Sequence, residues 1–328
     1  MSAGLKKWVN PIVFPLIDRD DSFQSDIKER ELKQFSICIV DDDEQVCRML
    51  HDLFKREGYV TTMAHNGKEA IERISESVPD LVISDIQMPV MDGFELFKIL
   101  EREHPRIKRI MMTSYDIDQY IKHIRKYNIG NILVKGSDFN LAEVAAYVRI
   151  ILTGEIFGLY RYFPDVSLQQ LSIRSYAEAK NAYQFIIQSY SDKKGFFLEV
   201  AVDELISNAI FHGVLQLSHL SRDRWSENII VPQTSAVKVT WGSDEEKIGI
   251  SIEDPKGNLK KTDVLKWLDT HRWSKEDDEH GRGFLLVRRL IDRLIINIDP
   301  GRRTECIIIQ NFKRNQNINN KPLLIHEL

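Results

Sequence analysis

Residues 35 to 155 alternate short apolar runs with longer segments in which apolar residues recur every three or four positions. The short runs are typical of buried strands and the longer segments of amphipathic helices. The predicted strands are SICIV, YVTTMA, DLVISD, RIMMTS and NILV, and the helices are CRMLHDLFKREG, GKEAIERISES, FELFKILERE, DQYIKHIRKYN and LAEVAAYVRIILTG. This order predicts an α/β domain with a doubly wound, five-stranded parallel sheet.

Residues 166 to 315 follow a different pattern, with strands clustered beside a few helices. The predicted strands are VSLQQLSIR, AVKVTW, KIGISIED, IINID and ECIIIQNFK; the helices are YAEAKNAYQFIIQSYS, a segment containing AVDELISNAIFHG, and FLLVRRLIDRL, which follows a long polar loop. They indicate an α+β two-layer sandwich with helices on one face of a mostly antiparallel sheet. The other segments are predicted to be an N-terminal extension (1–34), a linker (156–165) and a C-terminal tail (316–328).

Composition places the chain among ordinary globular proteins, with 328 residues, 43% of them hydrophobic and 29% charged. The net charge of −4 gives no reason to expect nucleic acid or an anionic membrane as the main partner. The second half also lacks a basic recognition helix for DNA. No apolar run is long enough for a membrane span, and Cys38 and Cys306 lie in apolar runs typical of buried thiols. We therefore expect a cytoplasmic protein.

Polar residues stand at the ends of four of the predicted parallel strands, where ligands of such sheets bind. Any one of them is explained by solvation, but together they suit Mg²⁺ and a phosphoryl group. Asp85 would be the nucleophile that forms an acyl phosphate, Lys135 would offset charge, and Thr113 would bind a phosphoryl oxygen. The residues at the strand ends are Asp41, Asp42, Asp43, Asp85, Thr113, Ser114 and Lys135.

The segments IVDDD, DLVISDIQMPVMDGFEL, MMTS and LVK resemble the receiver domain of bacterial two-component response regulators, which has a flavodoxin-like fold. The resemblance implies that a histidine kinase or phosphotransfer protein phosphorylates Asp85, with Thr113 and Lys135 as catalytic residues. It implies a Mg²⁺ site formed by Asp41, Asp42, Asp85 and the backbone carbonyl of Gln87. Two positions depart from the family: Gly136 replaces proline after the lysine, and Ile132 replaces the switch aromatic, so we expect no aromatic switch at residue 132.

A second candidate site begins on the helix that contains AVDELISNAIFHG. Glu204 and Asn208 fall at the edge of its apolar face, one turn apart. Alone, such a pair is an ordinary solvated helix edge. On the helical wheel, one broad apolar arc consists of Leu198, Val202, Leu205, Ile206 and Ala209. The positions that face water are Glu199, Asp203 and Ser207.

Downstream, Asp254 ends a strand, and HGRG opens a helix whose N-terminal amides suit a phosphate. AVDELISNAIFHG, IEDPKGN and HGRGFLLVRRLID together resemble the N box and two glycine boxes of the GHKL (Bergerat-fold) ATPase domain, of the anti-sigma-factor serine kinase type. The resemblance implies Mg-ATP binding, with Glu204 as general base, Asn208 as a Mg²⁺ ligand and a lid at residues 259–280. The other implied nucleotide-binding residues are Asp254, Gly257, Gly281, Arg282 and Gly283.

The first glycine box departs from the family pattern, because Lys256 and Asn258 occupy its two glycine positions. Two functions therefore stay open. In the first, phosphorylation of Asp85 controls a serine/threonine kinase that acts on a partner protein, such as an anti-sigma-factor antagonist or a sigma factor. In the second, the C-terminal domain is a partner-switching binding module without kinase turnover. The helix LAEVAAYVRIILTG and the segment GEIFGLYRYFPD are candidates for a homodimer or interdomain surface, although an apolar helix face also suits plain core packing.

Overall fold

The computed structural model describes residues 34–136, 139–188, 195–217, 229–269, 282–313 and 321–328. The expected N-terminal extension therefore lies outside the described residues, apart from Gln34. Within the described ranges, no helix combines the length and the apolar character needed to cross a bilayer. Cys38 and Cys306 are buried free thiols, as predicted.

The first half confirms the predicted doubly wound fold. Its strands are parallel, in the order β2-β1-β3-β4-β5. An Asp or Asn side chain caps the N-terminus of α2, α3, α4 and α6, which explains where these helices begin. The elements are β1 (Ser36–Val40), α2 (Glu44–Arg56), β2 (Val60–Ala64), α3 (Gly67–Glu76), β3 (Leu81–Asp85), α4 (Gly93–Glu103), β4 (Lys108–Thr113), η1 (Ile117–Tyr120), α5 (Ile121–Lys126), β5 (Asn131–Val134) and α6 (Leu141–Thr153).

The second half contains the predicted antiparallel sheet, in the order β9-β10-β8-β7-β6. The elements are η2 (Leu159–Arg161), β6 (Gln169–Ile173), α7 (Tyr176–Gln188), α8 (Gly195–Ser207), η4 (Asn208–Val214), η6 (Gln233–Ser235), β7 (Val237–Ser243), β8 (Lys247–Asp254), α9 (Lys261–Leu268), α10 (Arg282–Leu290), β9 (Arg293–Asp299), β10 (Arg303–Asn311) and β11 (Leu323–Glu327).

Two expectations about this half are wrong. The polar loop expected before His280 contains α9, which forms because Val264, Leu265 and Leu268 are spaced to bury one helix face. The helix expected to reach Leu294 ends at Leu290.

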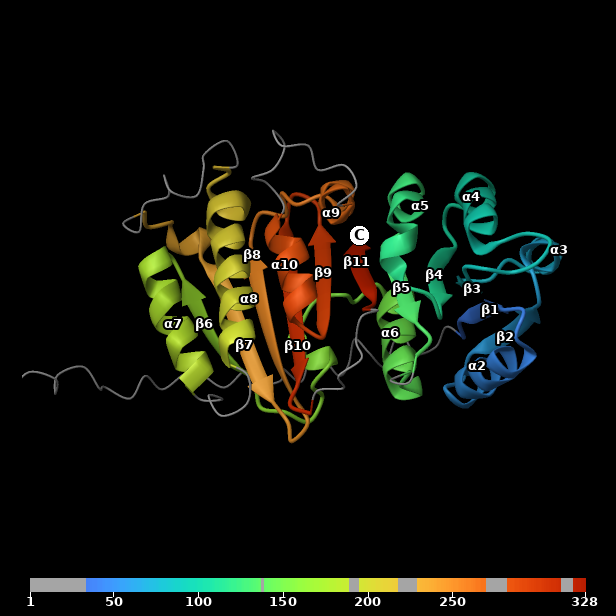
Figure 1. The fold of residues 1–328 in the computed structure, drawn as a ribbon, viewed down its shortest axis with the longest axis horizontal. Helices are drawn as coiled ribbons and strands as arrows, with labels where there is room; N and C mark the ends of the chain where they lie inside the picture. Colours follow the sequence, from blue (N-terminus) through green and yellow to red (C-terminus); the bar gives the residue numbers. More distant parts are fainter. Residues whose placement is uncertain (1–33, 137–138, 189–194, 218–228, 270–281, 314–320) are drawn as a thin grey trace, which may run out of the picture.

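The strand β11 joins the two halves and lies within the segment expected to be a C-terminal tail. It pairs in parallel with β9 over four residues, from Leu324 to Glu327. It also pairs antiparallel with β5, where Leu323 lies opposite Ile132. The described strands therefore form one eleven-stranded sheet through both halves (Figure 1).

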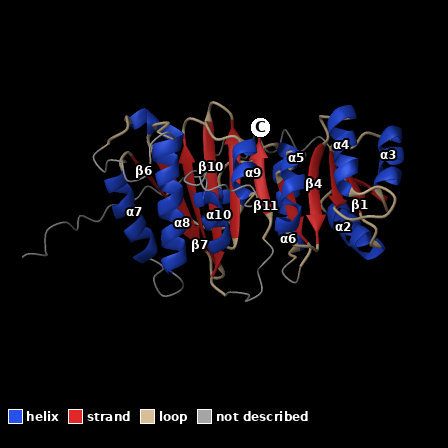
Figure 2. Cartoon of the chain, turned by 45° about the horizontal axis from the view of Figure 1, so that its top comes forward, coloured by secondary structure: helices blue, strands red, loops and turns tan. Residues whose placement is uncertain are grey.

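Two apolar layers cover this sheet, and each contains residues from both halves. Helices α3, α4, α5, α7, α8, α9 and α10 pack on one face, and α2, α6 and η2 pack on the other. Figure 2 shows the row of strands with helices packed along its length. The segment expected to be a linker belongs to the second layer, since Leu159 and Phe163 are buried and Gly158 N donates to Glu305 Oε2 at 2.9 Å.

Candidate functional site

Carboxylates from the carboxyl ends of β1 and β3 meet a lysine that follows β5. Lys135 Nζ lies 2.8 Å from Asp41 Oδ2 and also forms an ion pair with Asp85. Asp85 Oδ2 accepts a hydrogen bond from Gln87 N at 2.7 Å. Asp41, Asp85 and Thr113 are all buried. The structure thus brings Asp41, Asp85 and Lys135 together, with Thr113 buried at the end of β4. Asp43 instead caps the N-terminus of α2, and Ser114 is exposed.

The charges at this site are unbalanced. Burial raises the pKa of Asp85 and of Asp41, and the hydrogen bonds from Lys135 partly oppose this effect. Burial lowers the pKa of Lys135, but its bonds to the two carboxylates outweigh that and raise the pKa overall. One cation shared by two buried carboxylates leaves net negative charge, which a phosphoryl group would increase. A divalent cation would offset that charge.

Mg²⁺ suits this donor set, because it is often held by one or two carboxylates with water completing its octahedron. Asp42 is exposed beside the buried pair, and its charge acts on Asp85. Across the described residues, no three His, Cys, Asp or Glu side chains gather into a metal cluster of their own. Asp41 and Asp85 are the buried carboxylates that would hold Mg²⁺ here, with Asp42, a backbone carbonyl such as that of Gln87, and water as further ligands.

Two residues beside Asp85 were missed by the sequence analysis. A Cβ atom on Gly93 would lie 2.2 Å from the carbonyl oxygen of Asp85, so only glycine fits there. Gln87 Nε2 donates a hydrogen bond to Tyr120 Oη at 2.6 Å. An aromatic hydroxyl therefore stands beside the loop that follows Asp85, although it comes from η1 and not from β5, where Ile132 is buried. The Asp-Gly pair after PVM could have indicated Gly93; no sequence signal pointed to Tyr120.

At the second site, the motif helix changes pitch at its polar pair. The helix α8 ends at Ser207, and the π-helical turn η4 begins at Asn208. Asn208 Nδ2 donates to Glu204 Oε1 at 3.3 Å. A Cβ atom on Gly283 would lie 1.9 Å from Glu204 Oε1, so this carboxylate lies directly against the start of α10. Such π turns often occur at functional sites.

The helical-wheel prediction is confirmed for the apolar arc but wrong for Ser207. Ser207 is buried although it belongs to α8, so the polar face that the wheel predicts does not extend to the end of this helix. The residues of the apolar arc are all buried: Leu198, Val202, Leu205, Ile206 and Ala209.

Asp254 is held at the end of β8 as a buried carboxylate. Its Oδ1 accepts hydrogen bonds from Lys256 N at 3.0 Å and from Gly257 N at 3.2 Å. Burial raises the pKa of Asp254, and these two bonds oppose the shift. Gly257 has a φ of +62°, and a Cβ atom on it would lie 2.3 Å from the carbonyl oxygen of Asp299. Gly257 thus orients Asp254 and packs against the β9–β10 turn.

Some of the expected nucleotide-binding residues cannot be placed with the others. Gly281 and the part of the expected lid from residue 270 to 280 lie outside the described residues. Arg282 is exposed at the first position of α10. The described N-terminal part of the expected lid is α9, where Trp267 stacks on Phe284 of α10 with ring centroids 5.8 Å apart.

Two ion pairs join the receiver half to the ATPase-like half, between the two candidate sites. Arg288 Nη1 of α10 lies 2.6 Å from Asp118 Oδ1 of η1. Arg125 Nη1 of α5 lies 3.3 Å from Asp269 Oδ2, a fully buried carboxylate just after α9. The helices α9 and α10 are therefore bound to the η1–α5 segment that contains Tyr120.

Comparison with known proteins assigns both halves. The family model described as "Response regulator receiver domain" matches residues 37–148, and that described as "Histidine kinase-like ATPase domain" matches residues 188–309. Sporulation initiation phosphotransferase F of Bacillus subtilis (strain 168) is 39% identical over 113 residues, which are 34% of this chain and 90% of that protein. The chain belongs to the response regulator family. It combines a receiver domain with a histidine kinase-like ATPase domain.

Other relatives of this response regulator match about a third to a half of the chain. Transcriptional regulatory protein ZraR of Klebsiella oxytoca is 35% identical over 124 residues, which cover 36% of this chain and 28% of that protein. The match to the protein of the same name from Escherichia coli O157:H7 covers 35% of its length. The chain thus spans only a minor part of these curated relatives. Among solved structures, chemotaxis response regulator CheY4 of Vibrio cholerae has 24% identity and a TM-score of 0.34, covering 36% of this chain and 99% of that one.

Proposed function

We propose that phosphorylation of Asp85 controls the ATPase domain, which acts as a Mg-ATP-dependent serine/threonine kinase on a partner protein. The position of Glu204 is the observation that supports turnover most strongly. Its carboxylate binds Asn208 and lies against the backbone of Gly283. A base therefore stands beside an amide that can bind Mg²⁺ and beside a helix N-terminus, where phosphate groups are favoured.

The receiver site suits phosphoryl transfer to a carboxylate. An oxygen of Asp85 would attack the phosphorus of a phosphohistidine or of acetyl phosphate. The new P–O bond forms as the bond between phosphorus and the donor breaks, and the donor leaves. Lys135 already contacts Asp85 and would stabilise the transferred group, and the Thr113 hydroxyl would donate to one of its oxygens. Mg²⁺, when bound, would offset charge on the phosphoryl oxygens.

In the ATPase domain, Glu204 would accept the proton of a serine hydroxyl on the partner. The serine oxygen bonds to the γ-phosphorus while the bond from that phosphorus to the bridging oxygen breaks, leaving ADP. Asn208 binds Glu204 through Nδ2, so its amide oxygen is the atom that would bind Mg²⁺. Asp254, fixed by two backbone N–H groups, would accept a hydrogen bond from the adenine amino group.

The segment η1–α5 is the connection through which the receiver would act. Gln87, two residues after Asp85, binds Tyr120 at the end of η1. Asp118, in the same short helix, pairs with Arg288 of α10, whose first turn contacts Glu204. A movement of η1 that followed phosphorylation would therefore shift the N-terminus of α10 relative to Glu204.

The pair between Arg125 and Asp269 gives this connection a second point of attachment. Asp269 is fully buried, and separation from Arg125 would leave an uncompensated carboxylate in the interior. That outcome is strongly unfavourable, so α9 should follow α5 when α5 moves. The helix α9, which precedes the second glycine box, and the helix α10, which begins within it, would then both move with the receiver.

A direct test mixes the full chain with γ-labelled ATP and candidate partners, including anti-sigma-factor antagonists and sigma factors, with and without acetyl phosphate. We expect label on a partner serine or threonine, at a rate that changes when Asp85 is phosphorylated. Glu204→Gln should abolish transfer, and Asp85→Asn should remove the response to acetyl phosphate. Transfer that persists in Glu204→Gln would contradict the assignment of the base.

One observation favours the second candidate, the partner-switching module. Asn258, at a position where the family has glycine, donates from Nδ2 to the carbonyl oxygen of Gly213 at 2.8 Å. This bond holds the first glycine box against the end of the N box, two segments that the family resemblance assigns to nucleotide binding. If ATP does not bind, or binds without transfer to any partner, and partner binding still depends on Asp85 phosphorylation, the second function is correct.

A further inference from the structure

A cavity of about 270 Å³ lies at the junction of the two domains, away from both candidate sites. Lys108 and Asn131 stand at the amino ends of β4 and β5, whereas Asp85 and Lys135 lie at the opposite edge of the same sheet. Lys261 of α9 and His326 of β11 form the wall on the ATPase side. The volume far exceeds the roughly 10–15 Å³ that one water molecule needs, so it can hold a small ligand.

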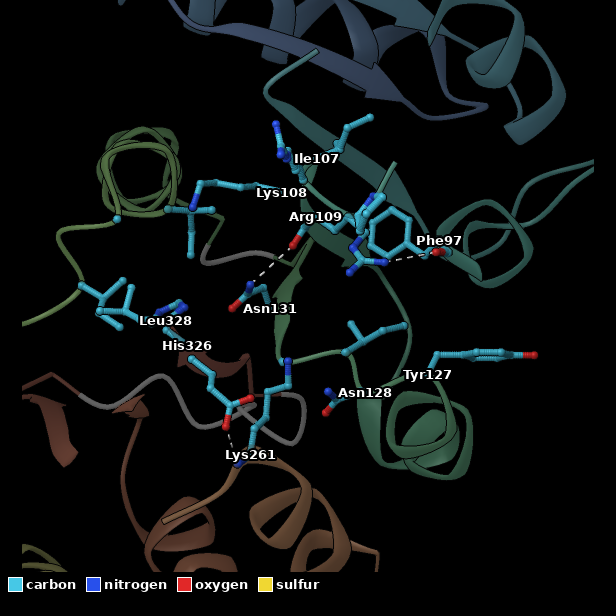
Figure 3. Close-up of a pocket in the computed structure, with 18 residues that line it drawn as sticks. Phe97, Ile107, Lys108, Arg109, Tyr127, Asn128, Asn131, Lys261, His326 and Leu328 are labelled. Carbon is cyan, nitrogen blue, oxygen red and sulfur yellow. Dashed lines mark hydrogen bonds between the residues drawn. The ribbon is translucent and has the colours of Figure 1, made fainter. Parts of the chain in front are cut away.

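Basic side chains dominate the walls of this cavity, which we call the junction pocket. Figure 3 shows the Lys261 side chain extending from the ATPase domain toward Asn131 and Arg109 of the receiver. The basic residues of the lining are Arg106, Lys108, Arg109 and Lys261. None of these four side chains forms an ion pair with a carboxylate of the described residues, and Glu327 is the only acidic side chain in the lining.

Two of these cations, Arg109 and Lys261, are held where their charge is unfavourable, whereas Arg106 and Lys108 are exposed. Burial lowers the pKa of Arg109 and of Lys261, and the charge of Arg109 further lowers the pKa of Lys261, against the opposing effect of Glu327. Like charges from two domains therefore face one another across an open space. Water would solvate them only in part, whereas an anion between them would offset the repulsion.

His326 supplies an independent sign of a ligand. It is 3% exposed and lines the pocket, yet neither of its ring nitrogens has a hydrogen-bond partner. Asn128 Oδ1, from the opposite wall, is also buried without a partner. Buried polar atoms are nearly always hydrogen-bonded in native proteins, and leaving them unpaired costs free energy. A ligand with both donor and acceptor oxygens would satisfy them.

We propose that the junction pocket binds a small phosphate-bearing anion, held by Lys108 and Arg109 from the receiver, by Lys261 from the ATPase domain, and by a hydrogen bond from His326. Because both domains supply ligands, the anion binds only when the domains are docked, and it therefore stabilises the docked arrangement. This inference needs neither phosphorylation of Asp85 nor turnover of ATP, so it stands or fails separately from the proposed function.

The test is calorimetric titration of the full chain with inorganic phosphate and with pyrophosphate, in EDTA so that neither candidate Mg²⁺ site is engaged. We expect a single site, and the double variant Arg109→Gln, Lys261→Gln should bind at least tenfold more weakly, since charge-assisted hydrogen bonds are lost. Lys266→Gln is the matched control, because Lys266 is an exposed lysine of the same helix outside the pocket. The control should bind as tightly as the wild type.

Three results would overturn the proposal. The first is equal affinity of wild type and double variant, with both shown to be folded by their thermal melts. The second is binding that is lost in Asn208→Ala but kept in the double variant, which would place the anion in the ATPase site. The third is tighter binding of citrate than of pyrophosphate, which would show that the preferred ligand of the pocket is a polycarboxylate and not a phosphate.

Nitrogen resonances of the His326 imidazole offer a second readout in the unmodified protein. They should shift on addition of phosphate, and unchanged resonances would contradict binding of the anion in the junction pocket.

Discussion

Arg288 Nη1 donates a hydrogen bond to Asp118 Oδ1 at 2.6 Å, between residues 170 positions apart in the chain. Arg288 Nη2 also donates to the carbonyl oxygen of Lys321 at 3.1 Å, and Lys321 Nζ in turn binds the carbonyl oxygens of Arg288, Arg289 and Ile291. One arginine thus connects the receiver, the helix α10 and the segment that leads into β11.

This relationship predicts that Arg288→Gln uncouples the two sites. ATP should still bind, but its affinity should no longer respond to phosphorylation of Asp85, because α10 has lost its bond to η1. Arg289→Gln, which removes the exposed neighbour, should leave the response intact. Calorimetry with and without acetyl phosphate measures both. An unchanged response in Arg288→Gln would show that coupling runs elsewhere.

The second prediction concerns the acceptor. Asp85→Asn should abolish labelling by acetyl phosphate, because an amide cannot form the acyl phosphate. The matched control is Asp43→Asn, since Asp43 caps α2 and asparagine caps a helix equally well. Labelling is followed by autoradiography of the full chain. Label retained in Asp85→Asn would place the acceptor on another residue.

The third prediction uses the contact between Glu204 and Gly283. In Gly283→Ala, the new methyl group would occupy the space of Glu204 Oε1, so the carboxylate must move away from α10. We expect Mg-ATP affinity to fall at least tenfold, which is about 1.4 kcal/mol. Gly136→Ala is a suitable control, because its added carbon meets nothing closer than 3.8 Å. Equal affinity in both variants would show that this contact is irrelevant to nucleotide binding.

The fourth prediction is a pH dependence of stability. Burial, together with the charges of Lys261 and Lys108, lowers the pKa of His326 from 6.5 to about 3. The unfolded chain therefore binds a proton between these pH values that the folded chain does not, and stability falls as the pH drops below 6.5. At pH 5 this one histidine should cost about 2 kcal/mol.

Comparison with His326→Gln isolates that effect. The raised pKa values of Asp41, Asp85, Asp254 and Glu305 act in the opposite sense over the acidic range, because the folded state binds those protons more tightly. They are common to both proteins and cancel in the difference. Urea unfolding at pH 7 and pH 5 should show a smaller loss for His326→Gln than for the wild type; equal losses would contradict the buried, neutral imidazole.

The elements of each half and the residues of both candidate sites could be predicted from the sequence, because apolar periodicity and polar strand ends can be recognised within short segments. Asp41, Asp85 and Lys135 follow apolar runs whose ends converge in any doubly wound sheet. Glu204 and Asn208 are one turn apart on a helix, so their proximity follows from spacing alone.

The junction could not be predicted in this way. The strand β11 is a short apolar run, and only its pairing with β5 and β9, at long sequence separation, distinguishes it from a tail. Arg125, Asp269 and Arg288 appear in the sequence as ordinary helix-surface charges, and their partners are set by domain docking. His326 likewise gains its unpaired, buried state only from the way the two domains enclose it.

The central claim is that the receiver controls the nucleotide site through the docked junction. The most direct measurement is the Kd of Mg-ATP for the full chain, before and after phosphorylation of Asp85 by acetyl phosphate, with Asp85→Asn treated in the same way. The account predicts a change of at least fivefold in the wild type, the lower end of ordinary allosteric coupling, and no change in Asp85→Asn. An identical Kd for the phosphorylated and unphosphorylated wild type would contradict it.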